Sequence, residues 1–176
     1  MDALLRAAFM GPQEAELVQR LRRDGLMFRE EIKPWEGRIG AYAAISRMVA
    51  PQGWYCLGPV AILPEWQRGA AGRKQGDDRN INSFNFGTRL VREIADMFLD
   101  VHGLWENYRT QKSEVVTEPP TLVVLGRPAF YTRAGFSQIR AARLTSPYPL
   151  EHTLIARPGA DVPEETLIYP AAFDGV

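Results

Sequence analysis

Hydrophobic residues recur at helical spacing in three parts of the chain. The first part is 2–9 and the second is 12–25, where Pro12 and Gly25 occupy the positions that proline and glycine favour at the start and end of a helix. In the third, 87–101, apolar residues return every three or four positions. This pattern predicts two short helices at the beginning of the chain and one long helix in its middle.

Three strands are expected between the second and the third helix. The segments 26–32 and 38–46 flank a Pro/Gly-containing turn at 33–37, which is typical of a hairpin. The segment 54–63 is almost entirely apolar, as expected of a strand in the middle of a sheet.

The remaining elements follow the long helix. A buried strand is expected at 121–126, and a short helix at 128–134 is ended by Gly135, which tolerates positive φ. Two more strands are expected at 136–144 and 152–157. A strand-helix-strand crossover inside a mostly antiparallel sheet gives an α/β sandwich.

Composition narrows the class of protein. The chain has 176 residues, 45% of them hydrophobic, which is enough for one domain with its own core. Lys and Arg number 21, as do Asp and Glu, so no net charge draws the chain toward nucleic acid or an anionic membrane. No segment approaches the roughly 20 apolar residues that span a bilayer, and the expectation is a soluble cytoplasmic protein.

Cysteine and histidine are scarce. Cys56 has no second cysteine for an intrachain disulfide, and no Cys/His cluster has the spacing of a zinc site. No metal is therefore expected. A buried structural thiol is a far better interpretation of Cys56 than a nucleophile, because no basic residue lies near it in the sequence.

The region after the central strand has the properties of a phosphate site. Pro59 has no N–H to give to a neighbouring strand, so it belongs either on an unpaired edge or where two strands part. The strand ends at Leu63, and a helix begins at Gly87. Free N–H groups at a helix start that follows a central strand bind phosphate readily.

Two motifs carry a family resemblance. The segments "GPVAILPEWQR" and "GTRLV" resemble the acetyl-CoA motif of the GCN5-related N-acetyltransferase (GNAT) superfamily, in which a strand of the type L-x-V-x-P-E-x-Q runs into R-x-G-x-G. "VVLGRPAFYTRAGF" is similar to the second half of the family pattern, and both ends of the chain resemble a bacterial subgroup of predicted acetyltransferases. The resemblance implies a GNAT-like mixed sheet, flanked by helices and splayed at its fourth and fifth strands.

The resemblance also implies where the co-substrate acetyl-CoA would bind. Pantetheine would lie in the splay, along the strand positions Val60, Ala61 and Ile62. Glu65, in the family's "PE" turn, is interpreted as structural.

The pyrophosphate would be held by Arg68 and Gly69 on one side of the phosphate turn and by Gly87 and Thr88 on the other. Three residues separate the Arg of R-x-G-x-G from its last Gly, whereas 18 separate Arg68 from Gly87. The segments 69–86 and 102–120 are therefore interpreted as insertions within a single domain, 1–176.

For the chemistry, the resemblance implies that Tyr131 protonates the departing thiolate. Candidates for the group that accepts the amine proton are weaker. Glu30 and Glu31 on the strand 26–32 and Ser46 on the strand 38–46 could reach an acceptor, but a structural or solvated role is favoured for each. Only one of the two glutamates can face the acceptor on a regular strand.

Two functions are compatible with this pattern. The first is an acetyl-CoA-dependent N-acetyltransferase that acts on an amine of a small molecule or peptide by direct attack. The second is a non-catalytic domain of the same fold, in which the interrupted phosphate turn no longer holds CoA. The family's first strand has no counterpart before Asp2, so the strand 26–32 is expected at an open edge, where a second copy could pair to form a homodimer.

Overall fold

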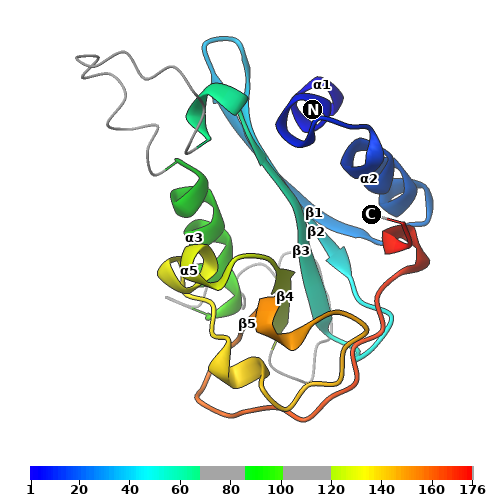
Figure 1. The fold of residues 1–176 in the computed structure, drawn as a ribbon, viewed down its shortest axis with the longest axis vertical. Coiled ribbons are helices and arrows are strands. Elements are labelled where there is room, and N and C mark those ends of the chain that lie inside the picture. Colours follow the sequence, from blue (N-terminus) through cyan, green and yellow to red (C-terminus); the bar gives the residue numbers. More distant parts are fainter. Residues whose placement is uncertain (68–85, 101–119, 176) are drawn as a thin grey trace.

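The computed structural model describes residues 1–67, 86–100 and 120–175 (Figure 1). The expected insertions 69–86 and 102–120 lie almost wholly outside these residues. So do the two predicted phosphate-binding residues Arg68 and Gly69.

Five strands form one sheet in the order in which they follow along the chain. They are β1 (Met27–Trp35), β2 (Arg38–Arg47), β3 (Trp54–Ile62), β4 (Thr121–Leu125) and β5 (Thr153–Ala156). All neighbours are antiparallel except β3 and β4, which are parallel and joined through a helix. The predicted crossover and the mostly antiparallel mixed sheet are thus confirmed.

Helices cover both faces of the sheet (Figure 1). On one face lie α1 (Asp2–Phe9) and α2 (Gln13–Arg23), and on the other lie α3 (Phe86–Phe98) and the short α5 (Pro128–Tyr131). These elements match the helices expected from the hydrophobic spacing, and α3 begins one residue before the predicted Gly87.

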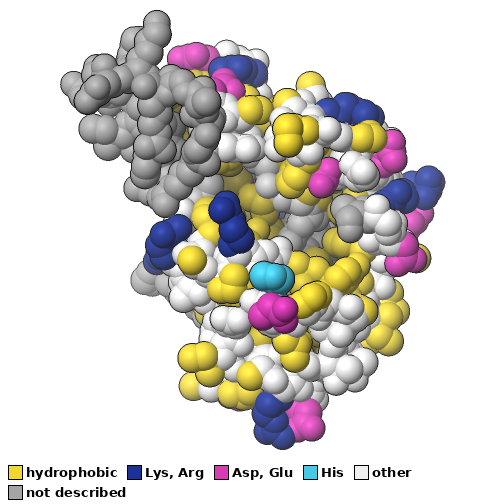
Figure 2. All heavy atoms as spheres, in the orientation of Figure 1, with side chains coloured by type: hydrophobic (Ala, Val, Ile, Leu, Met, Phe, Trp, Pro, Cys, Tyr) yellow, Lys and Arg dark blue, Asp and Glu magenta, His cyan; other side chains and the backbone are white. Residues whose placement is uncertain are grey.

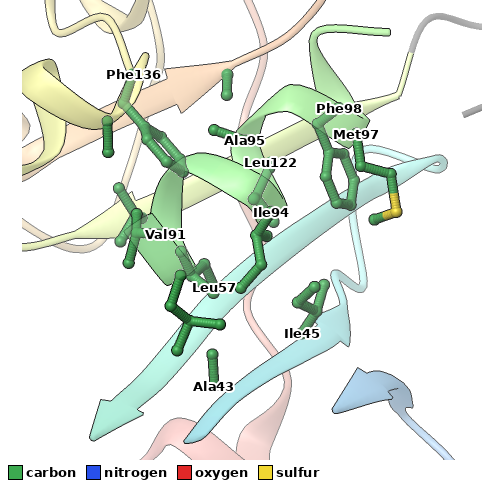
Figure 3. Packing of buried hydrophobic residues seen from close by; sticks show 14 of the residues in the cluster. Ala43, Ile45, Leu57, Val91, Ile94, Ala95, Met97, Phe98, Leu122 and Phe136 are labelled. Carbon is green, nitrogen blue, oxygen red and sulfur yellow. The ribbon is translucent and has the colours of Figure 1, made fainter. Parts of the chain in front are cut away.

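The core beneath α3 follows from its apolar face. Val91, Ile94 and Phe98 project toward the sheet, where they meet Ile45 of β2 and Leu57 of β3 (Figure 3). All five side chains are buried. This packing fixes the position of the α3 N-terminus relative to β3.

The sheet splays between β3 and β4. Their pairing begins at Trp54 with Thr121 and ends at Leu57 with Val124, whereas β3 continues to Ile62. Pro59 lies just beyond the last pair, so the prediction that it marks a parting of strands is confirmed. Beyond Leu57, no described strand pairs with the side of β3 that faces away from β2.

The hairpin turn is tighter than the sequence suggested. β1 runs through Lys33, Pro34 and Trp35, and only Glu36 and Gly37 connect the strands. Both have positive φ, 46° and 76°, as a two-residue hairpin turn of this hand requires.

The predicted strand at 136–144 is wrong. Only Ser137 forms a bridge with β5, and the backbone then coils into a 3₁₀ turn at Ile139–Ala141. Ile139 is 80% exposed, so the apolar residues here do not all face one core. The guanidinium of Arg140 instead donates to the backbone carbonyls of Arg157 and Asp161, which holds the segment against the next loop.

β1 lies at the edge of the described sheet and pairs only with β2. The homodimer expected from this edge remains a prediction. None of the described helices is long and apolar enough to cross a membrane.

Candidate active site

A cavity of about 430 Å³ opens where β3 and β4 part. Val60 and Ile62 of β3 form one wall, and Phe130 of α5 lies across from them. The side chain of Ala61 points to the opposite face of the sheet, where it is buried beneath α1 and α2. The strand therefore offers two apolar side chains to the cavity at Val60 and Ile62, with backbone between them.

The N-terminus of α3 closes one end of this cavity. Gly87 and Thr88, both in the first turn, are lining residues. The first turn carries no acidic residue, and the first N–H groups of a helix have no acceptor within it. The end of the cavity is thus suited to an anionic group.

The turn between β3 and the cavity is held by side chains of the "PEWQ" motif. Gln67 donates from Nε2 to the carbonyl of Ala8 at 3.2 Å, which ties the turn to the end of α1. Trp66 packs edge-on against Trp35, with ring centroids 5.2 Å apart, and also against Phe86. These contacts join the turn after β3 to the start of α3, and Trp66 and Gln67 are themselves lining residues of the cavity.

Glu65 of the same turn takes no part in the cavity lining. Its carboxylate accepts a hydrogen bond from the Arg38 guanidinium at 2.8 Å, on the surface. Such an exposed ion pair contributes little to stability.

Tyr131 is also among the residues that line the cavity. Its ring packs edge-on against Phe130 and Phe136, with centroids 4.9 Å and 5.7 Å away. Its backbone N–H donates to the carbonyl of Arg127, and its own carbonyl accepts from Phe136. The short helix and the residue after Gly135 thus fix the ring from both sides.

Burial raises the pKa of the Tyr131 phenol to about 12, against the opposing influence of the nearby Arg127 guanidinium. The phenol therefore keeps its proton at any physiological pH, as a proton donor must.

A second cavity, of about 230 Å³, also has Tyr131 among its lining residues. Its walls come from the end of α1, the first turns of α2, the β3 segment at Cys56 to Val60, and the C-terminal region at Tyr148 and Phe173. Phe9, Val60 and Tyr131 line both cavities. Tyr131, whose phenol carries a proton, is thus part of the walls of both cavities.

The surface is hollowed on the face seen in Figure 2, near its middle, and hydrophobic side chains surround the hollow. The larger cavity has mainly apolar walls but includes the cationic residue Arg127. This combination suits a ligand with a long weakly polar part and an anionic end.

The three weak candidates for a base lie elsewhere. Glu30 accepts hydrogen bonds from Arg22 and from the hydroxyl of Tyr42, the latter at 2.6 Å. Burial raises its pKa, but these two donors outweigh burial and the pKa lies below the usual value. A carboxylate held in this way is a poor proton acceptor.

Glu31, on the opposite face of β1, pairs with Arg29, and Ser46 is fully buried on β2. Neither is among the residues that line the two cavities. Their positions therefore agree with the structural or solvated role that the sequence favoured for Glu31 and Ser46.

Cys56 is buried in the sheet, and burial raises the pKa of its thiol to about 12. A thiol with so high a pKa is a poor nucleophile at neutral pH. Within the described part of the chain, no three His, Cys, Asp or Glu side chains gather as a metal site would require.

Several lining residues were not found from the sequence, among them Arg127, Phe9 and Glu14. Arg127 lies two residues after the end of β4, and a charged residue at that position was a usable signal. Phe9 and Glu14 come from α1 and α2, and only the folded arrangement of these helices brings them to the cavities.

Comparisons with known proteins agree with this geometry. No family model matches the chain, and no curated protein matches it. The structure is similar to that of the GNAT family N-acetyltransferase YhbS from Escherichia coli in complex with CoA. The TM-score is 0.67 at 25% identity, over 98% of this chain and 84% of that one.

A GNAT family acetyltransferase from Brucella melitensis, in complex with acetyl-CoA, is similar over 98% of this chain and 89% of that one. Its TM-score is 0.61 at 23% identity, a likeness of fold. The mostly antiparallel sheet, which parts between β3 and β4, agrees with the fold that the resemblance implied. The chain belongs to the GNAT superfamily.

Proposed function

We propose that this protein is an acetyl-CoA-dependent N-acetyltransferase that moves an acetyl group to an amine of a small molecule or peptide by direct attack. The observation that carries the proposal is that Tyr131 lines both cavities, close to the point where β3 and β4 part. A transferase with two substrates needs a proton donor where the two binding sites meet.

The residues of the larger cavity fit acetyl-CoA. Val60, Ile62 and Phe130 offer a weakly polar channel for pantetheine, and the α3 start at Gly87 and Thr88 offers N–H groups for the phosphates. Arg127 adds a cation to the same cavity. The structural neighbours bear on the same point, since they are acetyltransferases described in complex with CoA or acetyl-CoA.

Acetyl-CoA supplies an acetyl group as a thioester. The walls of the two cavities hold the amine nitrogen in line with the acetyl carbon, so that positioning supplies much of the catalysis. The nitrogen forms the new C–N bond as the C–S bond breaks. Tyr131 donates its proton to the departing sulfur, and the proton lost by the nitrogen restores the phenol through water.

Calorimetric titration with CoA and acetyl-CoA tests this proposal. We expect saturable binding to the wild-type protein and a large loss of affinity in Gly87→Asp, because the new carboxylate would lie where phosphate is expected. Gly87→Ala is the matched control, since an added Cβ at this position would have no neighbour closer than 3.6 Å.

Absence of heat at millimolar CoA would reject the enzyme and favour the second candidate, a non-catalytic binding module with an impaired CoA site. That candidate rests on the 18 residues between Arg68 and Gly87. Equal affinity of Gly87→Asp and Gly87→Ala would reject the placement of the phosphates at the α3 start.

A further inference from the structure

One carboxylate enters the smaller cavity. Glu14, in the first turn of α2, is among its lining residues, and its Oε2 is buried. No described residue donates a hydrogen bond to that oxygen. A buried carboxylate oxygen without a donor is unfavourable, so the Glu14 carboxylate has hydrogen-bonding capacity that no described residue uses and that a donor entering the cavity can use.

The helix positions Glu14 rigidly. Its neighbour Ala15 is fully buried, and Leu17 and Val18 one turn further pack beneath the helix. Glu16, on the outer face of the same turn, is exposed. The direction of Glu14 toward the cavity is therefore set by the packing of α2.

The rest of the wall defines what Glu14 can receive. Phe9, Leu57, Pro59 and Phe173 are apolar, and no Lys, Arg or His is among the described lining residues. A cavity with one carboxylate and no cation favours a positively charged group over an anion. An apolar wall favours an apolar body behind that group.

The size of the cavity limits the ligand. At about 230 Å³ it is smaller than the ~300–1,000 Å³ typical of pockets for drug-sized molecules. It suits a small molecule or a single side chain. Gly58 is one of the lining residues, and a Cβ at this position would meet no other atom within 4 Å. A larger side chain can therefore be introduced there to reduce the volume of the cavity.

We propose that Glu14 binds the ammonium group of the acceptor, and that this acceptor is a primary amine on a small apolar body. The inference rests on the proposed acetyl transfer, because it gives the second cavity to the second substrate. Glu14 accepts hydrogen bonds from the ammonium, which gives one proton to water before its nitrogen attacks, and the apolar wall holds the remainder.

Calorimetric titration of the CoA-saturated protein with 2-phenylethylamine tests the inference without requiring turnover. We expect saturable binding, and Glu14→Gln should weaken it by about tenfold or more, as expected for a charge-assisted hydrogen bond. Glu16→Gln, with the same change of charge on the same helical turn, should bind the amine as the wild type does.

A second ligand and a second variant distinguish the effect of the Glu14 charge from the effect of the cavity's size. 2-Phenylethanol has the same apolar body without the charge, so Glu14→Gln should leave its affinity unchanged. Gly58→Val narrows the cavity and should weaken both ligands together. Circular dichroism and the melting temperature show whether each variant is folded.

Equal affinity of wild type and Glu14→Gln for the amine would overturn the inference, and so would a failure of the wild type to bind the amine. In either case intact CoA binding leaves the proposed function standing. If CoA itself does not bind, the proposed function fails instead. Tighter binding of 2-phenylethanol than of the amine would also overturn the role of Glu14.

Discussion

Gly126 lies so close to the ring of Tyr131 that no side chain fits between them. A Cβ added to Gly126 would stand 2.4 Å from Cε2 of Tyr131, closer than carbon atoms approach without displacement. The backbone of Gly126 cannot retreat easily, because its N–H donates to the carbonyl of His152 at 2.9 Å. The absence of a side chain at 126 thus sets the position of the phenol.

Gly126→Ala should therefore displace the Tyr131 ring and lower kcat by about 10²-fold, the typical effect of misplacing a reacting group by about 1 Å. Steady-state kinetics with acetyl-CoA and an accepted amine measures the effect. In a Tyr131→Phe background the same substitution should cause little further loss, because the proton donor is already absent. Full activity of Gly126→Ala would contradict the positioning role.

Tyr131→Phe should lower kcat by about 10²- to 10⁴-fold, the usual contribution of a general acid, and leave the affinity for CoA nearly unchanged. The phenol pKa of about 12 lies above the ordinary value of 10.0, so the wild-type kcat should show no loss through phenol ionisation at or below pH 10. Stopped assays across pH measure this.

Tyr169→Phe is the matched control for that variant, since Tyr169 lies among the residues beneath α2 and lines neither described cavity. It should keep the wild-type kcat. Equal turnover of Tyr131→Phe and wild type would remove Tyr131 from the acid role.

Deletion of residues 69–83 tests the interruption of the phosphate turn. The described chain on either side ends at Gln67 and resumes in α3, both held by Trp66 against Phe86. We expect the deletion to preserve or improve CoA affinity in calorimetry, because loop length has only a logarithmic effect on closure entropy. Loss of affinity in a folded deletion variant would show that the segment contributes contacts to CoA.

Glu30→Gln should destabilise the protein by about 1–2 kcal/mol at pH 7, because it removes the charge that accepts hydrogen bonds from Arg22 and Tyr42. The folded-state pKa of Glu30 lies below its ordinary 4.5, so this stabilisation is present above pH 4.5 and is lost as the pH falls through the folded-state pKa.

Urea unfolding of both proteins from pH 7 to pH 3 measures this difference, which should shrink at the acidic end. The exposed Glu16→Gln variant should show almost no difference at any pH. A constant gap between Glu30→Gln and wild type across the range would contradict the linkage.

Periodicity alone predicts most of the fold. The apolar faces of α2 and α3 and the continuous apolar run of β3 appear in the sequence because burial selects the side chains at those positions. A strand was wrongly predicted at 136–144 because Phe136, Ile139 and Leu144 are apolar, but Ile139 is exposed in the structure. What orders that segment is Arg140, whose backbone acceptors are invisible in the sequence.

The candidate site is only partly predictable. Val60, Ile62, Gly87, Thr88 and Tyr131 fall in one cavity because motif spacing along a strand and a following helix constrains them locally. The smaller cavity joins α2, β3 and the C-terminal region, and such distant packing leaves no local pattern. Glu14 was therefore invisible as a cavity residue until the fold was known.

Among the described residues, the two cavities share Phe9, Val60 and Tyr131, and most of their other lining residues come from different segments. The larger depends on α3 and the residues after β4, and the smaller on α2 and the region from Tyr148 to Phe173. Under the proposed function, substitutions in this last region should alter the choice of amine without touching the part suited to CoA. The protein is accordingly a convenient scaffold for selecting new acceptor preferences, with changes confined to Tyr148 and Phe173, the two positions of this region that line the smaller cavity.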